Sequence, residues 1–269
     1  MEPNFDNIEP VDSKEYKSES ILRDDFKVFF TSCEDMSEIP DNHIHLHFTS
    51  IPYATMRGTM AYDSYTSYLK TMYTIFKEMY RTTKPGRCIL VNVSDYQISA
   101  QLDKEVIKGT EFELGEKFDC PSHMSYLMWK LNKHYAGRYD LQYEDTIVWR
   151  KSGSTSQRAG TFVSSGNPLK YRPEEVTERI LVFRKGDIDY RRVWKEKRNS
   201  DIYQDIKMGT YEEFEDWASV DVEQMRPYIQ NVWEIQPETQ SDHPAPFPPK
   251  LPEVAIKLYT LPREIVCDP

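Results

Sequence analysis

Several features are absent from this 269-residue sequence, and each absence excludes a class of protein. No apolar run approaches the roughly 18 residues that a membrane-spanning helix needs, so we expect no contact with a membrane. The four cysteines lie far apart and form no Cys-x-x-Cys pair, which fits a reducing compartment. The first residues, Met1–Asp12, are acidic and polar, unlike a signal or transit peptide. The sequence therefore predicts a cytoplasmic protein.

Acidic residues outnumber basic ones, but the charge is unevenly distributed. The chain has 44 Asp and Glu against 34 Lys and Arg, a formal net charge of −10, which by itself argues against nucleic acid as a partner. The segment Arg150–Lys207, however, holds 14 basic and 8 acidic residues, a local net charge of +6. Its small-residue loop, Lys151–Arg172, offers backbone N–H groups, hydroxyls and arginines of the kind that position a phosphate backbone. A solvated basic face would have the same composition, so both interpretations stay open.

The pattern of apolar residues predicts strands that alternate with helices, after an acidic lead (residues 1–22) expected to be disordered. Strands are expected at Phe26–Phe30, Ile44–Thr49, Cys88–Val93, Asp145–Arg150, Arg179–Lys185 and Glu264–Cys267. Helices are expected at Tyr65–Thr82, Ser122–His134 and Pro252–Tyr259, the first stopped by Lys84-Pro85-Gly86. The near-continuous apolar run CILVNV is typical of a strand covered on both faces. This alternation favours an α/β fold with a sheet of the Rossmann type.

Two short motifs on one expected strand could carry chemistry. His43, His45 and His47 would share one face of that strand and could bind zinc, although histidines packed inside a doubly covered sheet are the more ordinary interpretation. The same strand ends in the sequence TSIPY, and ligands of α/β sheets bind at the carboxyl ends of strands. Taken alone, this Ser-x-Pro-Tyr motif is equally consistent with a turn.

Together with motifs elsewhere, the Ser-x-Pro-Tyr motif resembles the DNA amino-methyltransferases of the β arrangement. The motifs are, in chain order, MSEIPDNHIHLHFTSIPY, NVSD, DTIVWRK, ERILVFRKG, NVWEIQPE and HPAPFPPKLPEVAIKLY followed by EIVCDP. The resemblance covers about Phe26 to Pro269. It implies transfer of a methyl group from S-adenosylmethionine to the exocyclic amine of cytosine (N4) or adenine (N6) in double-stranded DNA. The serine form of the motif favours cytosine N4.

The resemblance also implies how the motif would act. A base amine can be methylated only after the base leaves the stacked duplex and enters a pocket. Ser50 and the carbonyl group of Ile51 would accept the two amine N–H bonds, while Tyr53 would stack on the flipped base. Pro52 keeps Ile51 extended. Attack on the sulfonium methyl group is then a direct displacement that depends on positioning, so no metal is expected.

Further residues are assigned by the resemblance to the cofactor and to the DNA. Those expected at the cofactor are Ser32, His243, Pro244, Pro246, Phe247 and Asp268. Those expected at the DNA are Arg150, Lys151, Arg158, Lys170, Arg172, Arg191, Arg192 and Lys195. The implied organisation is a catalytic portion at 23–185 with a DNA-facing loop at 151–172, an inserted target-recognition region at 186–238, and the start of the cofactor-binding portion at 239–269. Within the recognition region, Trp233 is expected to pack rather than to stack on a base.

The sequence departs from the family pattern at two important places. Ile51 replaces the first proline of the motif and can still supply the backbone carbonyl group, in a less preorganised site. The sequence ends at Asp268-Pro269, where the family continues into a Phe-x-Gly-Ser-Gly-Thr loop, so the sheet is expected to be incomplete at its cofactor-binding edge. Three interpretations are open: a split enzyme whose loop comes from a second polypeptide, a truncated product that only binds DNA, or a fragment of a longer protein. We favour the first two.

Overall fold

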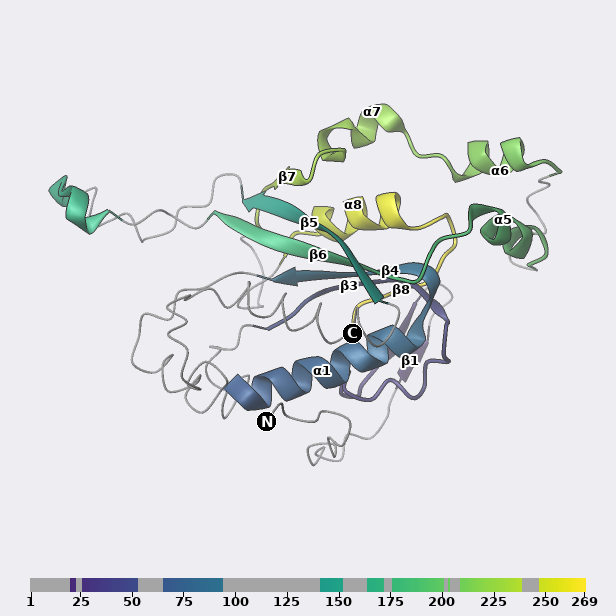
Figure 1. Ribbon diagram of the computed structural model, residues 1–269, viewed down its shortest axis with the longest axis horizontal. Helices are drawn as coiled ribbons and strands as arrows, with labels where there is room; N and C mark the ends of the chain where they lie inside the picture. The colour runs from purple at the N-terminus through teal and green to yellow at the C-terminus, as the bar shows by residue number, and fades with distance from the viewer. Residues whose placement is uncertain are drawn as a thin grey trace.

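A computed structural model gives the fold of nine stretches of the chain (Figure 1). The described residues are 20–22, 26–52, 65–93, 141–151, 164–171, 176–200, 203, 209–238 and 247–269. The helix expected at Ser122–His134 and most of the basic loop lie outside them. Among the helices described, none combines the length and the apolar character required to cross a membrane.

Six strands form one mixed sheet, in the order β7-β5-β6-β4-β3-β8. Their bounds are β3 Ile44–Ser50, β4 Thr83–Val93, β5 Leu141–Lys151, β6 Thr177–Lys185, β7 Val232–Ile235 and β8 Val266–Cys267. β3 runs parallel to β4 and β8, and β5 runs parallel to β7, whereas β6 is antiparallel to both of its neighbours. The last residues of β3, β4, β5, β7 and β8 therefore lie along one edge, called the carboxyl edge below, and their first residues lie along the opposite, amino edge.

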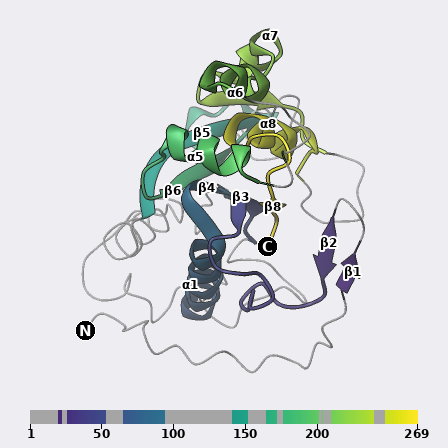
Figure 2. The same ribbon diagram turned by 90° about the vertical axis from the view of Figure 1, so that its right-hand side faces the viewer.

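Two long helices cover the two faces of this sheet. α1 (Tyr65–Thr82) lies on one face and α8 (Lys250–Tyr259) on the other, as Figures 1 and 2 both show. α1 has the bounds expected from its sequence, because apolar side chains at spacings of three and four residues form one buried stripe. The buried members of that stripe are Tyr68, Met72, Tyr73, Ile75, Phe76 and Met79. The resulting three-layer arrangement confirms the α/β, Rossmann-like fold.

The central strand β4 is buried on both faces, as its sequence predicts. Ile89 and Val91 pack in the core beneath α1, while Cys88 and Leu90 pack in the core beneath α8, and all four are at most 2% exposed. β4 begins earlier than expected, directly after α1, so that Lys84-Pro85-Gly86 both ends the helix and opens the strand. Thr83, the first residue of β4, pairs with Ile44 of β3, whereas β6 pairs with β4 only from Cys88 to Val93.

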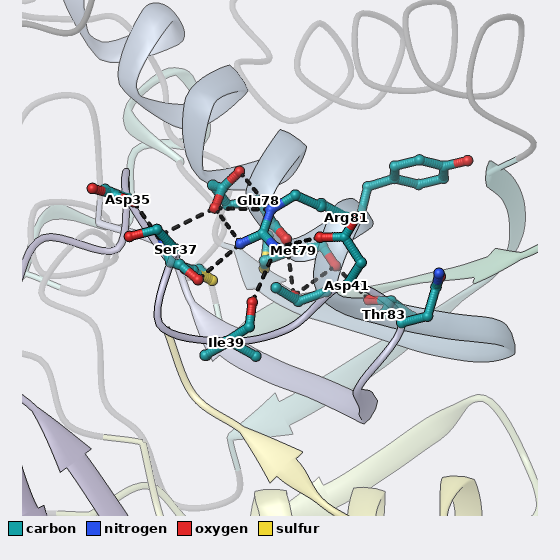
Figure 3. Close-up of polar contacts among 12 residues, drawn as sticks. Asp35, Ser37, Ile39, Asp41, Glu78, Met79, Arg81 and Thr83 are labelled. Carbon is teal, nitrogen blue, oxygen red and sulfur yellow. Dashed lines mark hydrogen bonds and ion pairs between the residues drawn. The ribbon is translucent and has the colours of Figure 1, made fainter.

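Arg81, in the last turn of α1, ties the segment before β3 to this helix (Figure 3). Its guanidinium pairs with Glu78 and Asp41 and donates hydrogen bonds to the carbonyl oxygens of Met36 and Ile39. The hydrogen bond to Glu78 is the main cause of the raised pKa of Arg81. This clamp fixes the start of β3 relative to α1. It thereby also fixes the position of the carboxyl end of β3.

Two smaller strands, β1 and β7, were not predicted from the sequence. β1 (Ser20–Leu22) pairs with β2 (Lys27–Phe29) in a separate two-stranded sheet, so the acidic lead is not disordered as far as residue 22. β7 falls inside the region expected for target recognition, yet it pairs with β5 in the main sheet. Trp233 of β7 is 1% exposed and packs in the core beneath α8, which confirms its expected packing role.

A third, smaller apolar cluster lies among the helices between β6 and β7. These are α5 (Tyr190–Arg198), α6 (Tyr211–Ala218), α7 (Val222–Met225) and the 3-10 turn η8 (Arg226–Tyr228). Val193 of α5, Phe214 of α6 and Tyr203 between them are its buried members. The described residues of 190–218 thus have a small apolar cluster, and Lys197 of α5 connects it to the main sheet by pairing with Glu264 before β8.

Candidate active site

Ser50, the last residue of β3, lies at the carboxyl edge beside the end of β8. Leu46 and His47 of β3 pair with Val266 and Cys267 of β8, so the residue after β8, Asp268, lies next to the end of β3. The Asp268 carboxyl group is hydrogen-bonded to the Thr49 side chain, but burial dominates and raises its pKa. The expected catalytic segment and one expected cofactor residue are therefore neighbours. Tyr53 lies outside the described residues.

A row of hydrogen bonds runs from Ser50 across four neighbouring strands. The Asn92 amide nitrogen Nδ2, on β4, donates to Ser50 Oγ at 3.2 Å and to Glu178 Oε2, on β6, at 2.6 Å. Glu178 Oε1 accepts from Lys151 Nζ at the end of β5, and this ammonium also lies 5.1 Å from the centre of the Trp149 ring. We call these four residues, Ser50, Asn92, Glu178 and Lys151, the carboxyl-edge row.

The carboxyl-edge row is a polar continuation of the core beneath α8. Alternate residues of a strand point to the same face, and Phe48, Leu90, Ile180 and Trp149 are the next residues inward on the four strands. Asn92 is 1% and Glu178 5% exposed, whereas Ser50 is only half-buried. The row therefore joins a buried, charged interior to a hydroxyl group at the rim.

Ile51 occupies its place in a way that a proline could not. Its N–H group donates to the Asn92 backbone carbonyl oxygen at 3.2 Å, which adds one more bond to the parallel pairing of β3 and β4. Its side chain is 6% exposed and packs with Met36 and Tyr68 in the core beneath α1. The departure from the family motif at Ile51 is thus accommodated by a hydrogen bond and by packing.

The expected cofactor residues are only partly brought together. Ser32 is half-buried, and its hydroxyl donates to Glu34 Oε2 at 3.3 Å. Burial, with Glu34 and Asp268 nearby, raises the pKa of the neighbouring Cys33, and burial, with Asp268 and Cys33 nearby, raises the pKa of Cys267 to about 11. The Cys33 thiol, next to Ser32, is thus within electrostatic range of Cys267 and Asp268 at the end of β8. Phe247 instead packs edge-on against Phe48, with ring centres 5.7 Å apart, and His243, Pro244 and Pro246 lie outside the described residues.

The three histidines do not form a shared site. His43 is exposed and precedes β3, whereas His45 and His47 are buried within it. His47 Nε2 lies 2.9 Å from Thr82 Oγ1, and burial lowers the pKa of His47 to about 3. Burial, followed by Lys197, Lys84 and Arg87, lowers the pKa of His45 to about 2, although its Nε2 lies 3.7 Å from the Glu264 carboxylate. Both buried rings are neutral, and the described part of the chain contains no group of three potential metal ligands.

The basic residues expected at the DNA are dispersed. Lys151 belongs to the carboxyl-edge row, and the exposed Arg150 pairs with Glu234 at 2.5 Å. Lys170, in the 3-10 turn η6 (Pro168–Lys170), is exposed, as are three residues of α5, Arg191, Arg192 and Lys195. In Figure 1, η6 and α5 lie at opposite ends of the longest axis. The described part of the basic segment does not form one surface. Arg158 and Arg172 lie outside the described residues.

Asn92 and Glu178 are the two participants to which the sequence assigned no site role. Each is a polar residue beside a strongly apolar run, in CILVNV and in TERILVF. A polar side chain at such a place needs a hydrogen-bond partner. That need was a usable signal, although it does not identify the partner.

Comparison with known proteins identifies the family of this chain. A family model described as DNA methylase matches residues 44–269, and the chain belongs to that family. A type II beta methyltransferase, M.BslI, of Bacillus sp. (strain NEB-606) is 25% identical over 88% of this chain, and M.MjaI, a type II methyltransferase of Methanocaldococcus jannaschii, is 26% identical over 90%. The aligned region spans 23% of the length of the first relative and 79% of the second.

Solved structures show the same fold. A protein of Thermus thermophilus, described as a DNA modification methylase and crystallised with S-adenosyl-L-methionine, has a TM-score of 0.52 and 18% identity, covering 86% of this chain and 74% of its own. The cytosine-N4-specific PvuII DNA methyltransferase has a TM-score of 0.51 and 17% identity, covering 86% and 69%. Membership of the DNA methylase family brings with it S-adenosylmethionine as the cofactor.

Proposed function

We propose that this chain provides the target-amine site of a DNA methyltransferase that acts on cytosine N4 in duplex DNA, with adenine N6 as the other acceptor to be tested. The observation that carries the proposal is the position of Ser50. Its hydroxyl group lies at the rim of the carboxyl edge, is held there by Asn92, and has Asp268 bound to the adjacent Thr49. An open α/β sheet binds its ligands at this edge.

Ser50 and Ile51 would act on the amine of a flipped base. With Asn92 Nδ2 on one lone pair of Ser50 Oγ, the second lone pair is available to one amine N–H, and the Ile51 carbonyl oxygen is the proposed acceptor of the other. Two acceptors favour the pyramidal amine, whose nitrogen lone pair is freed from the ring. The nitrogen then forms a bond to the methyl carbon as the carbon–sulfur bond breaks, and one amine proton is released to solvent. Tyr53 is the proposed stacking partner of the base.

The described residues near the end of β8 fit part of a cofactor site. When bound, S-adenosylmethionine supplies an electrophilic methyl group on its sulfonium sulfur. Asp268, as a carboxylate, can accept hydrogen bonds from hydroxyl or amino groups, and the Ser32 hydroxyl can both donate and accept. The 269 residues do not include the family's Phe-x-Gly-Ser-Gly-Thr loop. We propose that a loop of this kind, in a tail or a partner, completes the cofactor site.

Double-stranded DNA is the proposed substrate, and its phosphates are the proposed partners of the exposed basic residues. Since η6 and α5 lie at opposite ends of the molecule, a duplex that touched both would extend along the longest axis of the protein. Removing one cation that binds a phosphate should reduce the slope of log affinity against log salt by about 0.9. Glutamine substitutions at Lys170, and separately at the three basic residues of α5, show which end contributes.

The decisive experiment measures methyl transfer from labelled S-adenosylmethionine to duplex DNA. The chain is assayed alone and with an added segment that contains the glycine-rich loop, and the methylated nucleosides are identified by mass spectrometry. N4-methylcytosine is the expected product, and N6-methyladenine would reassign the acceptor. Salt-dependent DNA binding with neither methylation nor cofactor binding in any combination would show a non-catalytic DNA-binding protein instead.

Two serine variants test whether the site is the one proposed. Ser50→Ala removes the proposed acceptor and is expected to lower the methylation rate by at least about 100-fold. Ser37→Ala is the matched control, because Ser37 is exposed and lies in the clamped segment before β3 (Figure 3). Equal rates for the two variants would remove Ser50 from the site.

A further inference from the structure

The amide group of Asn92 has its orientation selected by a charged partner. An asparagine amide can exchange its oxygen and nitrogen by a half-turn with almost no change of shape, so its hydrogen-bond partners decide which atom faces which neighbour. An ionised carboxylate can only accept hydrogen bonds. Glu178 Oε2, 2.6 Å away, therefore selects the nitrogen, and the second N–H of the same nitrogen is directed at Ser50 Oγ.

The oxygen of the same amide supports this interpretation. Asn92 is 1% exposed, and its Oδ1 has no hydrogen-bond partner within the described stretches of chain. Without Glu178, we would expect the Asn92 amide to orient so that its buried oxygen accepts a hydrogen bond. The observed orientation instead leaves that oxygen without a partner among the described residues while the nitrogen donates to two acceptors. The orientation is thus imposed from the side of Glu178.

Lys151 supplies the opposite charge beside the buried Glu178 carboxylate. The Glu178 side chain is 6% exposed, and a buried carboxylate is stable only when it is paired. Lys151 Nζ, itself 23% exposed, pairs with the other carboxylate oxygen. The ammonium group thereby keeps the carboxylate an acceptor on the side that faces Asn92.

We infer that the Lys151–Glu178 ion pair is a positioning device for Ser50: it holds the Asn92 amide with its nitrogen toward Ser50 Oγ and so leaves the second lone pair of that oxygen directed at the target amine. This inference rests on the proposed function. With the amide turned, Oδ1 would attract the Ser50 hydroxyl hydrogen, and the hydroxyl would rotate toward Asn92. Lys151 would then serve the site through Glu178, whether or not it also touches DNA.

Two double variants isolate the effect of the acceptor at position 178. Lys151→Met with Glu178→Gln keeps a neutral acceptor oxygen beside Asn92, whereas Lys151→Met with Glu178→Met removes it. Both lack the two charges, so neither leaves an unpaired buried ion, and any loss of DNA affinity through Lys151 is common to both. Their thermal unfolding is measured first to show that both are folded.

The first measurement is kinetic. The variant with methionine at 178 is expected to methylate DNA about 10- to 100-fold more slowly than the variant with glutamine, with KM for DNA equal within about twofold. A purely structural role would change the stability of the two variants and leave their turnover the same. Equal turnover in the two folded variants would overturn the inference.

The second measurement does not depend on catalysis. In protein labelled with ¹⁵N-asparagine, the Asn92 side-chain signal is identified by its loss in Asn92→Ser. Its protons are expected to exchange with water at least about tenfold faster with methionine at 178 than with glutamine or glutamate. Unchanged exchange would overturn the inference even if methylation is observed. Absence of methylation in every variant, the natural chain included, with and without the added segment that contains the glycine-rich loop, would refute the proposed function, and the exchange rates would still decide the role of the ion pair.

Discussion

Glu264, at the amino edge of the sheet, and Glu178, at the carboxyl edge, are both almost completely buried, but their surroundings differ. One oxygen of Glu264 pairs with Arg87 and Lys197, and its other oxygen accepts the Leu261 N–H at 2.9 Å. Glu178 pairs with Lys151 and accepts from Asn92, which passes the interaction on to the half-buried Ser50. The first cluster is closed on itself, and the second ends at a hydroxyl group on the rim.

The difference suggests a division between a buried cluster that stabilises the fold and a row that positions the proposed catalytic hydroxyl group. The Glu264 cluster joins β4, α5 and the turn before β8, so removing Glu264 leaves two buried cations without their anion. The carboxyl-edge row ties neighbouring strands that the sheet already holds together. We expect its members to add less to stability, and they hold the hydroxyl group of the proposed active site. The four predictions below test this contrast through the free energy of unfolding.

The largest expected effect is that of Glu264→Ala. The substitution leaves Arg87 and Lys197, each with a side chain 9% exposed, without their anion, and it is expected to cost about 3–5 kcal/mol in urea unfolding. Glu253→Ala is the matched control, because Glu253 lies in α8 and pairs with two half-buried lysines at 2.8 and 3.1 Å. Losses of equal size in the two variants would show that the amino-edge cluster does not hold the fold.

Acid should weaken the fold through the amino half of β3. The folded pKa values of His45 and His47, about 2 and 3, lie below the value of about 6.5 in an unfolded chain. The folded state therefore binds fewer protons, so stability is complete above pH 6.5 and is lost as the pH falls below it. The two rings together predict a loss of about 2.5 kcal/mol between pH 7 and 5.5. Urea unfolding at both pH values measures it, and His47→Gln should halve the loss; a flat profile would contradict the prediction.

Ile51→Pro tests how the site accommodates its departure from the family. Proline removes the N–H bond to the Asn92 carbonyl and part of a buried side chain, with an expected cost of about 1.5 kcal/mol. Methylation should stay within about threefold, because both residues present a backbone carbonyl group. Ile51→Val keeps the N–H and should cost less. If Ile51→Val lost as much stability as Ile51→Pro, the packing of the Ile51 side chain, without the N–H bond, would account for the loss.

The smallest expected change in stability is that of Ser50→Ala. Asn92 keeps its bond to Glu178, and Ser50 is half-buried, so the loss should be less than about 1 kcal/mol. Thr82→Val removes a fully buried hydroxyl near the amino edge, one that lies 2.9 Å from His47 Nε2, and should cost more. The reverse order would abolish the distinction between the two edges.

Much of the fold could be predicted from sequence because its signals are local. The stripe of α1 and the apolar run of β4 lie within single segments, and each predicted its element and its buried faces correctly. β7 could not be placed in the sheet in this way. Its pairing with β5 joins segments about 80 residues apart, and four residues of alternating burial do not specify a partner.

The candidate site likewise has one part that local sequence signals predicted and another part that only the tertiary structure shows. The order of motifs identified the family and located Ser50 at a strand end, because motif and strand are both written in contiguous residues. Only the tertiary structure brought Asn92 and Glu178 together across 86 positions and turned Lys151 toward them. That meeting depends on the antiparallel register of β4 and β6, and a shift of one residue would turn these side chains to the other face. Sequence alone thus determined which strand carries the proposed site, and strand register decided which polar groups hold Ser50 in place.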